Sequence, residues 1–277
     1  MCGTCGCGDS AVIRLAAPGE PDGTGLDYLP VHDHPPGHDH AAHGPGGHDH
    51  GGHGPDGDGR TVVLQQKILA KNDELAGQNR AWLGGRGVFA VNLMSSPGAG
   101  KTTLLQHTAA GLAGTLALSV IEGDQETALD AERIRSAGCR VAQINTGAGC
   151  HLDAAMVGGA LRALDPPPGS VVVIENVGNL VCPALFDLGE GARVVLGSVT
   201  EGADKPVKYP HMFHRADLVL VTKTDLLPYV DFQPAAFSDA IGKVAPAAEI
   251  LQLSATTGDG LPGWYAWLRQ RARPAVR

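Results

Sequence analysis

The chain has 277 residues, of which 43% are hydrophobic and 18% are charged, so one globular domain with a modest extension fits its length and composition. The formal net charge of −8 resides in residues 1–59, which hold nine acidic residues and one basic residue. A neutral domain with an acidic tail lacks the basic patch that a nucleic-acid backbone requires, and no apolar run reaches the roughly 18 residues of a membrane helix. We therefore expect a cytoplasmic protein that binds neither nucleic acid nor membrane.

Three cysteines at the start of the chain form the first metal-binding pattern. Cys2, Cys5 and Cys7 lie within six positions, and with the nearby α-amino group they can supply four soft or borderline donors to Ni²⁺, Zn²⁺ or copper. The six cysteines of the whole chain are too few and too clustered for an extracellular disulfide framework. Metal binding is therefore the preferred interpretation.

Residues 1–59 are expected to form a disordered metal-binding tail. They contain 15 glycines and 7 prolines, and their apolar run at residues 11–17 is too short to offset the entropy of ordering the chain. Eight histidines between residues 32 and 53 lie in a background of Asp, Gly and Pro. This composition favours a multi-site metal reservoir over a defined cage, and a solvated linker without metal is the alternative.

Residues 60–277 are predicted to form an α/β domain with a mostly parallel sheet and helices on both faces. Leu64, Ile68, Leu75 and Trp82 recur at helical spacing, so we expect an amphipathic helix there. Apolar runs then alternate with helix-length segments, which is typical of a parallel sheet that binds ligands at the carboxyl ends of its strands. The strands are expected at residues 88–94, 116–121, 141–144, 171–174, 194–199, 218–221 and 250–253, and helices at 101–113, 128–137 and 152–164.

The segment after the first domain strand has the sequence of a phosphate-binding P-loop. Residues 95–103 are Ser-Ser-Pro-Gly-Ala-Gly-Lys-Thr-Thr, with Ser95 in place of the usual first glycine, and they lead into a predicted helix. The glycines let backbone N–H groups point at phosphate oxygens, Lys101 neutralises β/γ charge, and Thr102 offers its hydroxyl to Mg²⁺. The predicted nucleotide-binding residues of this loop are Gly98, Ala99, Gly100, Lys101, Thr102 and Thr103.

Two carboxylates at strand ends are predicted to assist nucleotide hydrolysis together with Lys101. Asp124 follows the strand at residues 116–121, and Glu175 follows the strand at residues 171–174. Carboxylates at this edge of a sheet hold the waters of Mg²⁺ and sense the γ-phosphate. A solvated loop charge is the alternative for each of them.

Cys150, His151 and Cys182 are predicted to form a second metal site inside the domain. The adjacent Cys150 and His151 lie at a loop-to-helix junction, and Cys182 follows Glu175 by seven residues. Three protein ligands leave a metal site incomplete, so the fourth position is open to water or to a second copy of the chain in a symmetric dimer. Cysteine is also common as a small buried hydrophobe, which is the interpretation preferred for Cys139.

Residues 222–225 predict the base of the nucleotide. Their sequence, Thr-Lys-Thr-Asp, resembles the Asn-Lys-x-Asp element of GTPases, with Thr222 in place of asparagine. The Asp225 carboxylate can accept two N–H bonds from guanine, which adenine cannot supply. Ser254 and Ala255 follow the last strand and look like the small-residue loop behind a guanine, although an ordinary polar loop is the alternative. GTP is therefore expected, with Lys223, Asp225, Ser254 and Ala255 at its base.

Together these motifs resemble the HypB family of hydrogenase nickel-incorporation GTPases over nearly the whole chain. The resemblance rests on the tail cysteines and histidines, the P-loop, and the segments at residues 122–124, 145–153, 175–183 and 201–206. It implies slow GTP hydrolysis, nucleotide-linked homodimerisation, a nickel site at the three tail cysteines, and a Zn²⁺ or Ni²⁺ site at the second cluster. It also implies two kinds of partner, namely hydrogenase maturation proteins and the hydrogenase large-subunit precursor.

The function implied by the resemblance is GTP-linked nickel insertion into NiFe-hydrogenase, with nickel storage by the His-rich tail. A storage protein with a vestigial GTPase, and a GTPase that matures another metalloenzyme such as urease, are the alternatives. A urease accessory GTPase is expected to carry Cys-Pro-His, whereas Cys182-Pro183 is followed here by Ala184. Because Cys182 follows Glu175 closely, a loop that shifts when the γ-phosphate leaves would also move a metal ligand, and such coupling is reciprocal.

Overall fold

The computed structural model describes residues 12–16, 29–30, 57–124, 134–135, 137–146 and 149–272. For residues 12, 14, 16, 29–30, 57–65 and 124 it describes the backbone alone. The three tail cysteines Cys2, Cys5 and Cys7 and the histidine tract lie outside the described residues. Most of the helix predicted at residues 128–137 also lies outside them.

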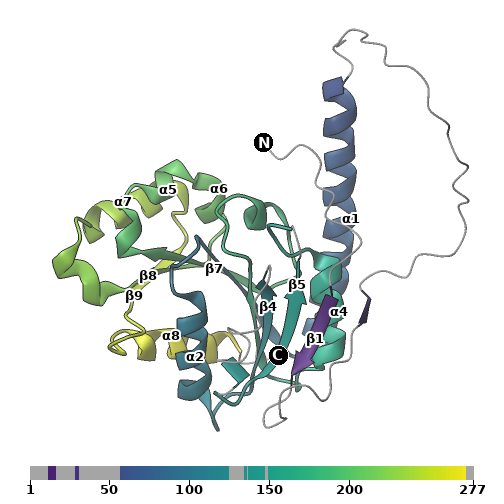
Figure 1. The fold of residues 1–277 in the computed structure, drawn as a ribbon, viewed down its shortest axis with the longest axis horizontal. Coiled ribbons are helices and arrows are strands. Elements are labelled where there is room, and N and C mark those ends of the chain that lie inside the picture. Colours follow the sequence, from purple (N-terminus) through teal and green to yellow (C-terminus); the bar gives the residue numbers. More distant parts are fainter. Residues whose placement is uncertain are drawn as a thin grey trace, which may run out of the picture.

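Nine strands form one sheet within the described residues, in the order β2-β1-β5-β4-β6-β3-β7-β8-β9 (Figure 1). The seven strands from β5 to β9 in this order are all parallel. They confirm the seven predicted strands with boundary shifts of at most three residues. Their bounds are β3 Phe89–Ser95, β4 Leu118–Asp124, β5 Arg140–Asn145, β6 Val171–Glu175, β7 Ala192–Ser198, β8 Leu218–Thr222 and β9 Glu249–Gln252.

Helices cover both faces of this sheet, as the continuous apolar strands predict. On one face, α2 (Lys101–Leu112) and α8 (Leu261–Arg271) pack on side chains such as Val91 and Leu93 of β3. The other face carries α1 (Gly57–Gly85) and α4 (Ala154–Leu164) over one half, and α6 (Pro210–Phe213) and α7 (Pro234–Val244) over the other. The remaining short helices are α5 (Lys205–Lys208), η1 (Cys182–Leu185), η2 (Val199–Glu201) and η3 (Thr224–Tyr229).

The helix predicted over residues 64–82 is present in α1, which begins earlier, at Gly57. Figure 1 shows its first half extending away from the sheet while its second half lies beside α4. Among the described residues, no helix combines the length and apolar character needed to cross a membrane.

The expectation that all of residues 1–59 are disordered is wrong for two short strands and for residues 57–59, which begin α1. Val12–Ala16 forms β1, which pairs antiparallel with β5, and β2 (Leu29–Pro30) pairs with β1. Ile13 is 1% exposed and belongs to the core beneath α4, where the absence of a side chain at Gly159 admits it. The apolar run is short, but it gains stability because it satisfies the backbone hydrogen bonds of an edge strand as well as burying Ile13.

Candidate functional site

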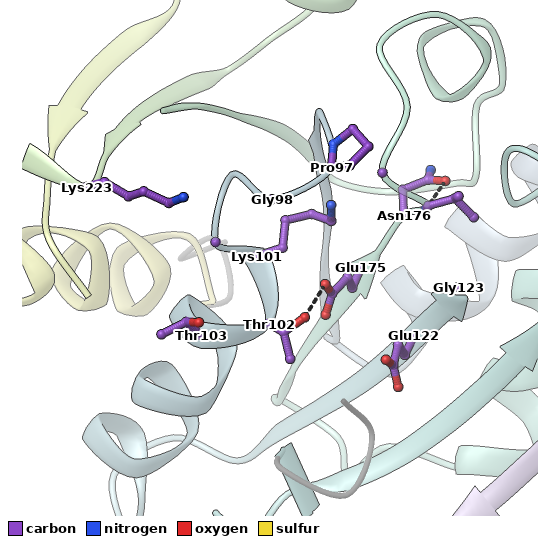
Figure 2. Close-up of a pocket in the computed structure, with 13 residues that line it drawn as sticks. Pro97, Gly98, Lys101, Thr102, Thr103, Glu122, Gly123, Glu175, Asn176 and Lys223 are labelled. Atoms are coloured by element: carbon purple, nitrogen blue, oxygen red, sulfur yellow. Dashed lines mark hydrogen bonds between the residues drawn. The ribbon is translucent and has the colours of Figure 1, made fainter. Parts of the chain in front are cut away.

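A cavity of about 520 Å³ lies at the carboxyl edge of the parallel strands (Figure 2). Its volume is in the range of small-molecule sites. Most of the predicted nucleotide-binding residues line it, from the P-loop, from Glu175 and from Lys223. The predicted residues in its lining are Gly98, Gly100, Lys101, Thr102, Thr103, Glu175 and Lys223.

The P-loop has the backbone conformation that its glycines predict. Gly98 and Gly100 have φ angles of 75° and 98°, a region that favours glycine, and α2 begins directly afterwards at Lys101. The Lys101 Nζ donates to the Ser95 hydroxyl over 2.9 Å, and both side chains are buried. The serine that replaces the usual glycine therefore gives the P-loop lysine a hydrogen-bond partner.

A carboxylate pair faces the P-loop threonine at the bottom of this cavity. The Thr102 hydroxyl donates to the Glu175 Oε1 over 2.9 Å, and Glu122 and Glu175 are directly paired in register on β4 and β6 (Figure 2). Both carboxylates are at least nine-tenths buried. A hydroxyl and two carboxylates are oxygen donors of the kind that Mg²⁺ prefers, so the residues fit a magnesium–nucleotide complex.

The structure adds Glu122 to the predicted carboxylates, and the role predicted for Asp124 stays a prediction. Glu122 lines the cavity, whereas Asp124 is the last residue of β4 and its side chain lies outside the described part of the chain. Sequence reasoning missed Glu122 because it looked for the residue nearest the strand end. The pairing with Glu175, which depends on the register of two strands distant in sequence, is the signal that identifies it.

The elements predicted to hold guanine are connected to one another and to the P-loop. The Ser254 hydroxyl donates to the Asp225 carboxylate, which joins the two segments after β8 and β9. The Thr222 hydroxyl donates to the Ala99 carbonyl over 2.8 Å, so this residue braces the P-loop from the strand end. Asp225, Ser254, Ala255 and Ala99 are outside the lining of the 520 Å³ cavity.

A second brace of the P-loop comes from the segment at residues 201–206. The Lys205 Nζ donates to the Ser96 hydroxyl over 3.1 Å and to the Glu201 Oε2 over 2.9 Å, and Ser96 also donates to Glu201. Lys205 and Glu201 are mostly buried. Sequence reasoning recognised this segment as a motif but assigned no role to its residues.

Cys150, His151 and Cys182 come together as predicted. Their ligand atoms all lie within 4.8 Å of one another. The Cys150 Sγ and His151 Nδ1 are 3.6 Å apart. Metal–sulfur and metal–nitrogen bonds of about 2.3 and 2.1 Å at a tetrahedral angle place two donors about 3.6 Å apart, so this pair fits one tetrahedral ion such as Zn²⁺.

The surroundings of His151 suit a metal ligand. Its side chain is 5% exposed, and this burial lowers the pKa of the imidazole while the Asp153 carboxylate partly opposes the shift. The neutral imidazole, which is the ligating form, is therefore favoured. Phe186 stacks on the imidazole with ring centroids 4.0 Å apart and an interplanar angle of 23°. Asp153 also caps α4 by accepting from the Met156 N–H, which fixes the loop-to-helix junction.

Cys139 is separate from this cluster, in agreement with its predicted core role. It is buried in the core between the sheet and the α2–α8 face. Burial raises the pKa of its thiol to about 11, so it is poorly suited to bind a metal.

The chain is similar to proteins of one family. Residues 89–252 match the CobW/HypB/UreG nucleotide-binding domain. The hydrogenase maturation factor HypB of Rhizobium leguminosarum bv. viciae is 54% identical over 219 residues, which cover 79% of this chain and 73% of the relative. The crystal structure of the hydrogenase maturation factor HypB from Archaeoglobus fulgidus superposes with a TM-score of 0.70 at 38% identity, covering 74% of this chain and 100% of that one. The structure of HypB from Helicobacter pylori in complex with nickel gives a TM-score of 0.68 at 37% identity, covering 75% and 99%.

Proposed function

This chain belongs to the HypB family of hydrogenase maturation factors, and on that premise we propose that it is a GTP-hydrolysing nickel metallochaperone. In this proposal it binds nickel and assists its insertion into NiFe-hydrogenase. The observation that carries the proposal is the position of two sites on one sheet edge. The segment from Glu175 to Cys182 links the nucleotide cavity directly to the thiol cluster.

Hydrolysis of GTP is supported by the groups around the cavity. Backbone N–H groups of the P-loop and the start of α2 favour the phosphates, and Lys101 neutralises the charge that develops between β- and γ-phosphate. Thr102, Glu122 and Glu175 would hold Mg²⁺, which when bound supplies positive charge beside these phosphates. Asp225, supported by Ser254, would accept guanine N–H groups.

Nickel is the proposed cargo of the cluster, and Zn²⁺ is a further ion that its donors suit. Two thiolates and one imidazole leave a coordination position open, to be filled by water or by a second copy of the chain in a nucleotide-linked homodimer. An incomplete site suits a chaperone, because a cargo ion must leave. Release is linked to hydrolysis if the segment from Glu175 to Cys182 shifts on loss of the γ-phosphate.

The N-terminal tail is proposed to bind nickel as well. Cys2, Cys5 and Cys7 form a nickel site, and the histidine tract stores further nickel ions. The proposed partners are hydrogenase maturation proteins and the hydrogenase large-subunit precursor. The proposed location is the cytoplasm, where thiols such as those of Cys150 and Cys182 stay reduced.

Lys101→Ala tests the GTPase part of the proposal. Because this change removes charge neutralisation at the phosphates, we expect GTP turnover to fall sharply while nickel binding by the tail is retained. Phosphate release and nickel equilibrium dialysis measure the two properties on the same preparation. Loss of both properties together would contradict a protein with separate nucleotide and tail sites.

Deletion of the gene tests the cellular part. We expect NiFe-hydrogenase activity to be lost and to be restored by excess nickel in the medium, since nickel supply is the step that the protein assists. Complementation with the Cys150→Ser variant should remain nickel-dependent. Full hydrogenase activity in the deletion strain at low nickel would reject the proposal. Many bound nickel ions per chain with negligible GTP turnover would instead favour a storage protein.

A further inference from the structure

A buried polar chain connects the nucleotide cavity to the metal cluster, and it starts at Asn176. This residue directly follows Glu175, lines the cavity and is 1% exposed. Its backbone N–H donates to the Leu93 carbonyl of the neighbouring strand, so its position is held by the sheet. Its side-chain amide makes hydrogen bonds in two directions.

The first direction leads to His151. The Asn176 Oδ1 accepts from the Leu152 N–H over 3.2 Å and from the Val177 N–H over 3.0 Å. Leu152 is the residue next to His151 and is fully buried. Its side chain also fills the space beside Gly123, where a Cβ atom would lie 2.7 Å from the Leu152 Cγ. Gly123 lines the cavity, so the Leu152 side chain, next to His151 in the sequence, also packs against the nucleotide site.

The second direction leads to the segment after Cys182. The Asn176 Nδ2 donates to the Asn92 Oδ1 over 3.3 Å, and the Asn92 Nδ2 donates to the Glu190 Oε1 over 3.3 Å. Arg193 Nε donates to the same carboxylate oxygen over 2.7 Å. The four side chains are each at least nine-tenths buried, so water competes little for these bonds.

The guanidinium of Arg193 completes the connection. It donates to the carbonyl oxygens of Ala184 and Phe186 over 3.4 Å each. Ala184 lies in η1, which begins with Cys182, and Phe186 stacks on His151. The series of hydrogen bonds from Asn176 through Asn92, Glu190 and Arg193 therefore reaches the metal cluster on the side of Cys182 and Phe186.

We infer that Asn92 is a positioning residue that transmits the nucleotide state from Asn176 to the metal cluster through Glu190 and Arg193. This inference rests on the proposed function, since it names the residues by which that site is regulated. Asn92 is in the middle of β3 and outside the cavity lining, so it can act only through its neighbours. An amide suits this place, because it accepts from one partner and donates to the next.

Asn72 provides a matched control. It is a buried asparagine that also bridges the two segments beside the cluster, since its Oδ1 accepts from the Ala154 N–H and its Nδ2 donates to the Asp187 carbonyl. Both bonds are short, at 2.9 and 2.8 Å, but Asn72 lies on α1 and does not line the nucleotide cavity. Asn72→Leu therefore loosens the same region without interrupting the chain from Asn176.

The experiment compares metal affinity in two nucleotide states. The parent is the full chain with the three tail cysteines changed to serine, so that the cluster and the core residue Cys139 hold the remaining thiols. Titration with Co²⁺ is followed by the thiolate-to-cobalt charge-transfer band, to which histidines of the tail do not contribute. The coupling factor is the ratio of Co²⁺ dissociation constants with GDP and with a non-hydrolysable GTP analogue. The ratio of the GDP and analogue dissociation constants must change by the same factor when Co²⁺ is added.

We expect a coupling factor of about 5 to 150 in the parent, in the range typical of linked sites. Asn92→Leu should bring it to about 1, while nucleotide affinity without metal stays unchanged and Asn72→Leu keeps the parent's factor. If Asn92→Leu does not fold, Asn92→Ser provides the same test, since a serine side chain is too short to reach both partners.

Four results would overturn the inference, and the last of them would overturn the proposed metal site as well. If both Asn92 variants keep the parent's factor, the chain through Asn92 is wrong and the proposed function stands. If Asn72→Leu loses the factor as well, loosening of the region and not transmission explains the effect. A parent that forms the cobalt band and binds nucleotide with a factor of 1 has no coupling to transmit. A parent without the cobalt band contradicts the proposed metal site itself.

Discussion

Gly178→Ala tests how closely the segment after Glu175 must pack on the P-loop. A Cβ atom at residue 178 would lie 3.1 Å from the Cα, 3.2 Å from the N and 3.3 Å from the Cγ of Pro97. Carbon atoms in ordinary contact are about 3.5 to 4.0 Å apart, so the two segments must separate by a few tenths of an ångström. Two of the three neighbours are backbone atoms that cannot rotate away. The φ of Gly178 is outside the left-handed region, so steric contact is the only cost of the methyl group.

The expected magnitude follows from overpacking. An extra methyl group in a close-packed contact costs about 1 to 3 kcal/mol. Gly178 and Pro97 both line the nucleotide cavity, so this cost falls on the arrangement that binds nucleotide. Since 1.4 kcal/mol is a factor of about ten, the affinity for GDP should fall by about 5- to 150-fold.

Titration with a fluorescent GDP analogue measures this loss, and thermal unfolding measures any general destabilisation. Gly242→Ala is the control, because a Cβ atom there has no neighbour within 4 Å. Residue 242 is inside α7, so alanine should stabilise the protein by about 0.5 to 1 kcal/mol and leave GDP affinity unchanged. If Gly178→Ala binds GDP as tightly as the parent, the packing between these segments does not shape the site.

Three further predictions concern separate features. Thr222→Val removes the hydroxyl that donates to the Ala99 carbonyl, so the affinity for GDP should fall by about 5- to 10-fold. Isothermal titration measures this affinity. An unchanged affinity would mean that the bond does not support the P-loop. Ile13→Ala should lower the free energy of unfolding in urea by about 2 to 5 kcal/mol, since Ile13 is 1% exposed, whereas a free tail would give no change. The Cys139 thiol has a pKa raised to about 11, so it is almost wholly protonated at pH 8. Iodoacetamide should therefore alkylate it far more slowly than Cys150, and peptide mass spectrometry measures both rates. Equal rates would contradict the burial of Cys139.

The elements of the fold could largely be predicted from the sequence. The seven parallel strands are short, mostly apolar runs, and strand and helix signals of this kind are local. The P-loop was predictable for the same reason, because nine consecutive residues contain its glycines, lysine and threonines. The strand at Val12–Ala16 was missed, since its stability comes from pairing with β5, more than 120 residues away.

The candidate sites, like the fold, were predicted only in part from the sequence. The sequence alone identified the residue types that bind phosphate and metal, because each motif is a short run whose chemistry is set by its side chains. The tertiary structure alone decided that Glu122 lies opposite Glu175, and that Asn176 reaches Leu152 on one side and Asn92 on the other. These contacts join strands and loops that are far apart in the chain. Their geometry depends on strand order and register, which are determined by packing of the whole domain and not by any local run of residues.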